Sequence, residues 1–188
     1  MINPNNIIKY NRSVAELEEL ILFLVCVAGK KATTVAPQME KFLSGKPKVN
    51  TPFEFIKSQG NNVVNLGLRQ QGFGCYTRLT RAFIELANSN LNLRTCTKED
   101  SIKIHGIGLK SASCFLCWTR PNQRLAMLDT HLLKEMKELG LADRIPKSTP
   151  SSKKEYERLE NVWLSHCDAL GVDSTTYDLE VWVRRSNG

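Results

Sequence analysis

The feature that most constrains this chain is the helical spacing of its apolar residues, which continues along nearly its whole length. No segment shows the strict alternation of apolar and polar residues that is typical of a half-buried strand. Helix-start signals accompany the spacing: Ser13 and Glu16 form a capping-box pattern, and Thr51 precedes a proline at the first helical position. The pattern predicts an all-α fold of about nine or ten helices on short connections.

Short breaks rich in glycine, proline and serine separate these helices. With 188 residues, of which 41% are hydrophobic, the chain can bury one sizeable core. We therefore expect a single domain over residues 1–188, built as one compact body or as two small lobes that share a core. The expected helices cover Ser13 to about Ala28, 33–43, a segment from Thr51, 61–70, 75–88, Thr97 to Ile104, 109–118, 130–139, Ser152 to about Leu170, and Ser174 to Arg184.

The cysteines and the start of the chain indicate its compartment. No signal-peptide pattern is present, the apolar stretch at 20–28 is too short to span a membrane, and irregular cysteine spacing favours reduced thiols in a cytoplasm. Cys114 and Cys117 have the spacing of a metal or redox pair. No second pair follows, and both lie in an apolar helical run, so we expect no metal site. The cysteines are Cys26, Cys75, Cys96, Cys114, Cys117 and Cys167.

The charge balance is basic, with 26 lysines and arginines against 19 aspartates and glutamates and a formal net charge of +7. A basic chain favours a polyanionic partner such as nucleic acid. A basic soluble protein without such a partner fits the same composition. Charge alone leaves both interpretations open, and the motifs have to distinguish them.

The stretch HGIGLKSASC contains a tight glycine turn between two expected helices. Gly106 and Gly108 permit backbone angles with positive φ and let another backbone come close. Ile107 can pack between the helices, and Ala112 is small enough to let them approach. The N–H groups at the start of the second helix can bind a phosphate. These features predict a helix–hairpin–helix over about 97–118 that holds a DNA strand by its backbone, with a plain helical hairpin as the alternative.

Lys110 follows the second glycine almost directly, at the start of a helix. The partial positive charge of a helix start gives a lysine there no gain in stability, so the placement indicates a role in chemistry. Asp129 stands 19 residues later, where an apolar segment delivers it to the start of the helix expected at 130–139. An aspartate there is also a good N-cap.

GIGLKSASCFL and LAMLDTH resemble the hairpin and the aspartate segment of the HhH-GPD superfamily of DNA glycosylases. Within it the chain is most similar to the small type-two 8-oxoguanine glycosylases, the Ogg family of archaea and bacteria. The later motifs DTH, IPK and DLEVW also match that family, and the resemblance is most specific from Ile104 to Trp182. It implies a two-lobed helical fold and a bifunctional DNA glycosylase with AP lyase activity.

The resemblance also implies a mechanism. Lys110 would attack C1′ of the damaged nucleoside and displace the base, and the resulting Schiff base would permit β-elimination and a nick 3′ to the lesion. Asp129 would stabilise the cationic sugar and help to position or deprotonate the lysine. The structural alternative for Asp129 is the N-cap alone.

Several further residues take roles from the resemblance. Cys114, Asp178 and Trp182 would line the pocket for the flipped base, with core packing or helix capping as the alternatives. His131 would contact a phosphate or the flipped nucleotide, and a local hydrogen bond is its alternative. The loop containing Lys30 and Lys31 would approach the minor groove, where surface charge is the simpler interpretation. The hairpin residues Gly106, Ile107 and Gly108 would hold the DNA backbone.

Two positions depart from the family pattern. The type-two enzymes end in a lysine after the tryptophan, whereas here Trp182 is followed by VRRSNG, and Cys114 stands where histidine is common. Both differences concern the base pocket, so a modified base such as a decorated cytosine in phage DNA is an alternative to 8-oxoguanine. A non-catalytic helix–hairpin–helix DNA-binding module and a structural helical domain are the alternatives outside this chemistry.

The expected partner is double-stranded DNA that contains a damaged or modified base, bound by a monomer in a prokaryotic cytoplasm near the nucleoid. No cofactor is expected to be required, although the hairpin carbonyls could hold a structural monovalent cation. An iron–sulfur cluster needs four closely spaced cysteines near the C-terminus, and only Cys167 lies beyond Cys117.

Overall fold

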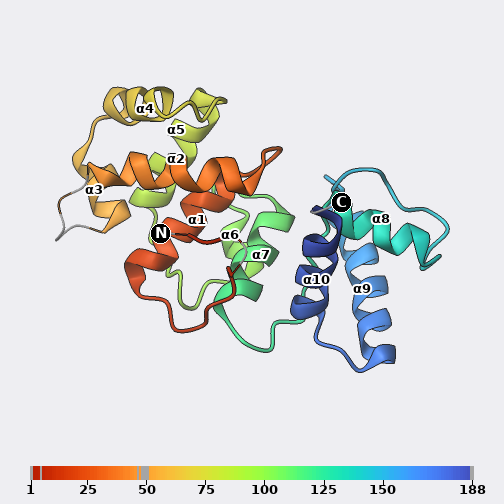
Figure 1. Ribbon diagram of the computed structural model, residues 1–188. Coiled ribbons are helices and arrows are strands. Elements are labelled where there is room, and N and C mark those ends of the chain that lie inside the picture. The colour runs from red at the N-terminus through yellow and green to blue at the C-terminus, as the bar shows by residue number, and fades with distance from the viewer. Residues whose placement is uncertain (1, 5, 46, 48–50, 187–188) are drawn as a thin grey trace. The chain divides into compact units, whose positions relative to one another are not determined.

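The computed structural model describes residues 2–4, 6–45, 47 and 51–186. These residues form ten α-helices and no strand, as Figure 1 shows, which confirms the all-α prediction. The chain divides into two compact units, Met1–Ile107 and Gly108–Gly188. The helices are α1 (Val14–Cys26), α2 (Ala32–Ser44), α3 (Pro52–Ser58), α4 (Asn61–Gln70), α5 (Tyr76–Asn88), α6 (Lys98–Ser101), α7 (Leu109–Thr119), α8 (Thr130–Glu138), α9 (Lys153–Leu170) and α10 (Ser174–Ser186).

The first unit is organised around α1, which is buried on all sides over its last two turns. Helices α2, α3 and α5 pack against it, and α5 also contacts α3 and α4. Phe42 of α2 lies at the centre of an aromatic cluster and meets three other rings edge-on, at centroid distances of 5.6 to 6.2 Å. Gly67 of α4 approaches this ring so closely that an added Cβ would lie 3.0 Å from it.

The second unit packs α8, α9 and α10 around one apolar cluster (Figure 1). Trp163 and Tyr156 of α9 are fully buried at its centre. Glu135 of α8 is buried beside this core and binds two arginines of α10, Arg184 at 2.6 Å and Arg185 at 2.9 Å through Nε. Because a buried carboxylate needs compensating partners, this pairing fixes α10 along α8.

Most helix starts agree with the sequence signals. Ser13 makes the predicted capping box with Glu16, and Thr51 and Thr97 each make a capping box with an acidic residue three positions later. The sequence also offers Ser152 and Ser174 as caps for the last two helices, and both expectations are wrong. The Ser152 side chain makes no cap bond. At the start of α10 the Asp173 carboxylate accepts the Thr176 N–H, at 2.8 Å.

The short helix before the glycine turn is smaller than predicted. The sequence indicated a helix from Thr97 to Ile104, and α6 covers only Lys98–Ser101. Beyond it the chain continues in tight turns, in which Lys103 and Ile104 donate to carbonyls three residues earlier. Such i to i+3 bonds are typical of a helix end that tightens toward a turn.

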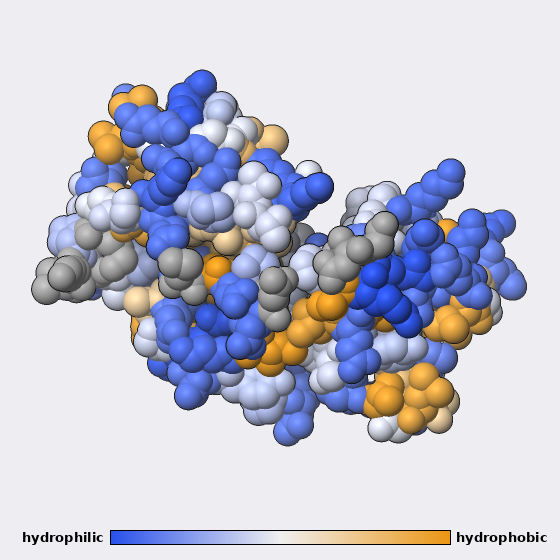
Figure 2. Space-filling model, in the orientation of Figure 1, coloured by the Kyte–Doolittle hydropathy of each residue, from blue (hydrophilic) through white to orange (hydrophobic). Residues whose placement is uncertain are grey.

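No helix among the described residues is long and apolar enough to cross a membrane. Hydrophilic residues cover most of the face in Figure 2, with apolar side chains scattered among them. The most exposed of these apolar side chains include Leu66 of α4 and Leu170 at the end of α9, each 54% exposed. Scattered exposed apolar residues are usual on protein surfaces.

Candidate active site

The glycine turn is fixed to α5 within the first unit. Gly106 has φ +84°, a left-handed conformation that favours glycine, and an added Cβ would lie 3.1 Å from the Ala82 Cβ. The His105 N–H donates to Glu85 Oε1 at 2.9 Å. Ile107 is buried, as the sequence predicted. The close approach predicted for the first glycine is therefore an approach to a helix of the protein itself.

The start of α7 is left open. Gly108 is its N-cap, with extended backbone at φ −94°, and makes no side-chain cap bond. Lys110 is the second residue of the helix and is half-buried. Its ammonium group makes no hydrogen bond or ion pair with any residue that the structure describes. The arrangement leaves the first N–H groups of α7 and the lysine amine available to a ligand.

Asp129 is carried to α8 by a largely buried segment without regular secondary structure, Leu125–Leu128, which we call the anchored segment. Ala126 and Leu128 are fully buried and Met127 is 7% exposed, so the polar groups of this backbone need partners inside the protein. Side chains supply them. Ala126 N donates to Glu160 at 3.0 Å, Met127 N donates to Asp178 at 2.8 Å, Tyr156 Oη donates to Ala126 O at 2.6 Å, and Thr149 Oγ1 donates to Leu128 O at 2.7 Å.

Asp129 caps α8 with one of its carboxylate oxygens. Oδ1 accepts the N–H groups of His131 and Leu132, both at 2.9 Å, which confirms the N-cap prediction. The Asp129 N–H donates back to Met127 O at 2.6 Å. Oδ2 has no hydrogen bond to the described part of the chain, so half of the carboxylate stays available. The catalytic role of Asp129 stays a prediction.

The charges of three predicted site residues affect the pKa of the Cys114 thiol. Burial raises its pKa to about 12; the Lys110 charge opposes that shift, and the charges of Asp129 and Asp178 add to it. These residues are far apart in sequence, so the second unit brings them together around one thiol. Cys114 itself is 2% exposed on α7. A thiol held protonated at neutral pH is uncharged and a poor nucleophile.

Asp178 and Trp182 lie one turn apart on α10. Asp178 is 5% exposed, and its Oδ2 accepts the Met127 N–H. Burial raises the pKa of this carboxyl well above its ordinary value, while hydrogen bonding to Met127 and to the Trp163 side chain opposes the shift. Its Oδ1 has no hydrogen bond of normal geometry to a described residue. Trp182 is half-buried. Their predicted contact with a base stays untested.

The residues predicted to touch the DNA backbone differ in exposure. His131 is half-buried, and its backbone N–H is used by Asp129. Lys31 is exposed and precedes α2. The ammonium nitrogen of Lys30 is enclosed and has no hydrogen-bond partner among the described residues. It lies beside Gly74, so the surface position expected for Lys30 is wrong for its charged end.

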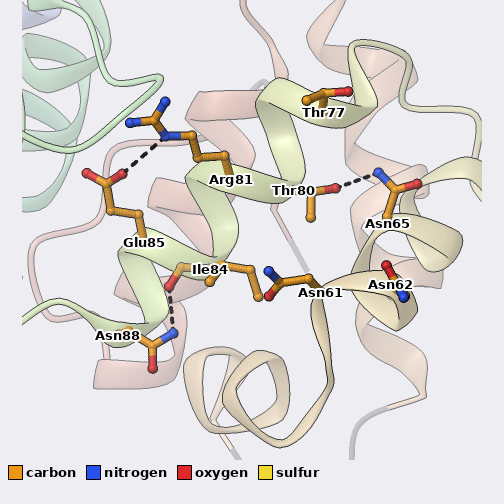
Figure 3. A pocket seen from close by; sticks show the side chains of 9 residues that line it. All are labelled: Asn61, Asn62, Asn65, Thr77, Thr80, Arg81, Ile84, Glu85 and Asn88. Atoms are coloured by element: carbon orange, nitrogen blue, oxygen red, sulfur yellow. Dashed lines mark hydrogen bonds and ion pairs between the residues drawn. The ribbon is translucent and has the colours of Figure 1, made fainter.

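A pocket of about 470 Å³ lies in the first unit, between α4 and α5 (Figure 3). Its lining is mainly amide and hydroxyl side chains, and Asn65 donates to Thr80 across it at 2.9 Å. Arg81 and Glu85 of α5 pair at its edge, at 3.8 Å. None of the predicted site residues lines this pocket.

Sequence reasoning did not single out Glu160, and it assigned Asp178 to the base pocket without predicting its bond to the anchored segment. Glu160 lies among apolar residues on the buried face of α9, and Asp178 lies on the buried face of α10 near Val181. A carboxylate at a core position of an amphipathic helix is the signal that could have found them, because an unpaired buried charge is costly. It could not have named their backbone partners.

The chain is similar to known 8-oxoguanine DNA glycosylases. A family model described as 8-oxoguanine DNA glycosylase matches residues 50–172. An 8-oxoguanine DNA glycosylase/AP lyase of Thermotoga sp. (strain RQ2) is 43% identical over 77 residues, which are 41% of this chain and 36% of that relative. The aligned segment therefore spans about a third of the relative's length.

Two crystal structures of the Methanocaldococcus jannaschii 8-oxoguanine DNA glycosylase share the fold. The first has a TM-score of 0.73 at 21% identity and covers 95% of this chain and 81% of that one. The second, a complex with a 15mer DNA containing 8-oxoguanine, has a TM-score of 0.71 at 20% identity and covers 95% and 84%. Because the family model covers most of the sequence, the chain belongs to the 8-oxoguanine DNA glycosylase family with a helix–hairpin–helix.

The two glycines of the turn provide a matched test of the hairpin geometry. We expect Gly106→Ala to lower the free energy of unfolding by about 1–3 kcal/mol, because alanine is strained at positive φ and its Cβ would press on Ala82. Gly108→Ala should cost less than about 1 kcal/mol, since Gly108 has ordinary φ and open space around it. Denaturant unfolding of both variants measures the difference. Equal losses would contradict this account of the turn.

The raised pKa of Asp178 predicts a pH-dependent effect of Asp178→Asn. Between the unfolded pKa of about 3.9 and the higher folded pKa, the folded wild type binds more protons than the unfolded chain, so its stability falls as pH rises. The asparagine variant lacks this loss. Its free energy of unfolding, relative to wild type, should therefore increase from about pH 4 toward neutral pH. Chemical denaturation at several pH values measures this difference, and a constant difference would contradict it.

Proposed function

We propose that the protein is a bifunctional DNA glycosylase and AP lyase that excises an oxidised base, with 8-oxoguanine as the first candidate. The observation that carries the proposal is that the second unit gathers a lysine amine without partners and a half-free carboxylate around the Cys114 thiol, whose pKa responds to both charges. Lys110 stands without partners at an uncapped helix start, and Asp129 keeps Oδ2 unbonded while Oδ1 caps α8. A nucleophile beside an acid–base partner is the arrangement that this chemistry requires.

In the proposed reaction, the neutral amine of Lys110 forms a bond to C1′ and the glycosidic bond breaks, its electron pair leaving with the base. Asp129 Oδ2 stabilises the positive charge that develops on the sugar and accepts a proton from the attacking amine. Opening of the sugar ring gives the Schiff base. Loss of a C2′ proton then expels the 3′ phosphate, which nicks the strand.

We further propose how the DNA is held. The open N–H groups that follow Gly108 bind one backbone phosphate, and Gly106 and Ile107 shape the turn before them. Lys31 and His131 add contacts to the backbone or to the flipped nucleotide. The target base has to leave the duplex to reach Lys110. Contacts of this kind do not depend on sequence, which suits a search for damaged bases.

Cys114 and Trp182 are proposed to line the base pocket, with a protonated thiol and an aromatic ring as their contributions. The family and its DNA complex with 8-oxoguanine support that base as the substrate. A modified base is the second candidate, because a small thiol stands at the pocket position where relatives often carry histidine. Residues 187–188, in the stretch after Trp182 that departs from the family pattern, lie outside the described residues.

The remaining parts of the proposal concern setting and partners. Double-stranded DNA with a damaged or modified base is the partner, and the protein acts as a monomer in a prokaryotic cytoplasm near the nucleoid. The proposed reaction runs on side chains of the chain itself and requires no cofactor. The hairpin carbonyls are the proposed place for a structural monovalent cation.

Borohydride trapping tests the lysine chemistry directly. Wild-type protein should form a covalent adduct on duplexes that carry 8-oxoguanine or a plain abasic site, and Lys110→Gln should form none, because an amide cannot make a Schiff base. Gel mobility of the adduct is the measurement. Trapping on the abasic site without trapping on 8-oxoguanine would retain the lysine and redirect the substrate to another base. An adduct in Lys110→Gln would contradict the assignment.

Asp129→Asn separates catalysis from helix capping. Asparagine is as good an N-cap as aspartate, so the melting temperature should stay close to that of wild type. The single-turnover excision rate should fall by about 100- to 10,000-fold, because the amide cannot accept the proton. Thermal melting measures the first effect, and single-turnover excision assays, with DNA affinity determined alongside, measure the second. An unchanged rate would leave Asp129 with a structural role only.

A further inference from the structure

Asp178 of α10 holds the anchored segment by a long-range hydrogen bond. Its Oδ2 accepts the Met127 N–H at 2.8 Å, across 51 residues of sequence. The side chain is 5% exposed, and the backbone that it binds is equally enclosed. A hydrogen bond between two buried groups has no ready replacement by water, so its loss would leave the Met127 N–H unsatisfied.

Residue Met127 connects this bond to Asp129 through its two backbone polar groups. Its N–H is bound by Asp178, and its carbonyl accepts the Asp129 N–H at 2.6 Å. The carboxylate of Asp129 is then fixed by the start of α8 through Oδ1. Asp178 is thus two hydrogen bonds away from the proposed acid–base group, with a single residue between them.

Only one neighbouring bond acts on the same peptide unit. Glu160 binds the N–H of Ala126 and Thr149 binds the carbonyl of Leu128, and both groups belong to other peptide units. Tyr156 Oη donates at 2.6 Å to the Ala126 carbonyl, which shares a peptide unit with the Met127 N–H. Without the Asp178 bond this unit would be held at its carbonyl alone, so its N–H side could tilt and shift the Asp129 backbone.

We propose that Asp178 is a positioning residue that sets the orientation of the Asp129 carboxylate through Met127. The inference rests on the proposed function, since it concerns the same site. Displacement of a reacting group by about 1 Å can lower a rate by about 100-fold, so a side chain that touches neither sugar nor amine can control the chemistry. This role differs from a contact between Asp178 and the flipped base.

The test uses a duplex with a plain abasic site, where no base is present to be contacted. The rate of adduct formation, measured by borohydride trapping, should fall by about 10- to 100-fold in Asp178→Ala, because Asp129 is misplaced. In an Asp129→Asn background the same substitution should have little further effect, since the group that it positions is already gone. Fully additive losses, or an unchanged rate on the abasic site, would overturn the proposal.

Two comparisons separate positioning from general destabilisation. Glu18→Ala removes another buried carboxylate that binds a backbone N–H, that of Phe53 at 2.8 Å, in the first unit. Its effect on the rate should be small and additive with Asp129→Asn. Asp178→Asn keeps an oxygen that can accept the Met127 N–H and should recover most of the rate lost in Asp178→Ala. A rate in Asp178→Asn as low as that of Asp129→Asn would overturn the proposal.

The asparagine variant also tests the proposal if Asp178→Ala does not fold, because its rate can be compared directly with those of wild type and of Asp129→Asn. Wild-type protein serves as the reference for the proposed function. Without trapping by wild type on any duplex, the proposed function itself fails. If wild type is trapped but the rate losses of Asp178→Ala and Asp129→Asn are additive in the double variant, only the proposed role of Asp178 fails.

Discussion

A buried stretch of backbone that belongs to neither helix nor sheet has to find a partner for each of its polar groups, and this requirement organises the second unit. The anchored segment meets it with side chains from α9, α10 and the loop before α9. Two of these partners are buried carboxylates, which are costly to enclose unless they are bonded. The segment and the helices around it are therefore mutually dependent. The outcome of that dependence is the fixed position of Asp129 at the start of α8.

The residues of the candidate site fall into two kinds. Those that build it have their hydrogen-bonding capacity largely used: Glu160, Tyr156 and Thr149 are each bonded to the anchored segment. Those assigned to chemistry retain unused capacity, as in Lys110 and Oδ2 of Asp129. Groups without internal partners at a helix start are expensive to leave in that state unless solvent or a ligand completes them. The site is marked by this contrast between residues with occupied hydrogen-bonding groups and residues with unoccupied ones, because neither a lysine nor an aspartate is unusual by itself.

Local signals predicted the fold well and the site only in part. The positions of the helices, three capping boxes and the left-handed turn at Gly106 follow from residues that are neighbours in sequence. The motifs around Lys110 and Asp129 likewise placed both residues at helix starts. The enclosed ammonium of Lys30 and the backbone bond of Asp178 could not be predicted, because each depends on a contact between segments distant in sequence. Asp173 caps α10 in place of Ser174, whose hydroxyl donates instead to the distant Leu125 carbonyl at 3.3 Å.

The hydrogen bond between Met127 and Asp178 constrains the residue type at position 178 more than at position 127. The donor is a main-chain group, which every residue except proline supplies, so the side chain at 127 is free to vary within the limits of an apolar environment. The acceptor is a short side chain that has to reach across the core, and few residue types can do so. Related chains that share this geometry would therefore tolerate exchange at 127 and resist it at 178. A relative with an apolar side chain at 178 would have to hold the backbone before its equivalent of Asp129 by other contacts.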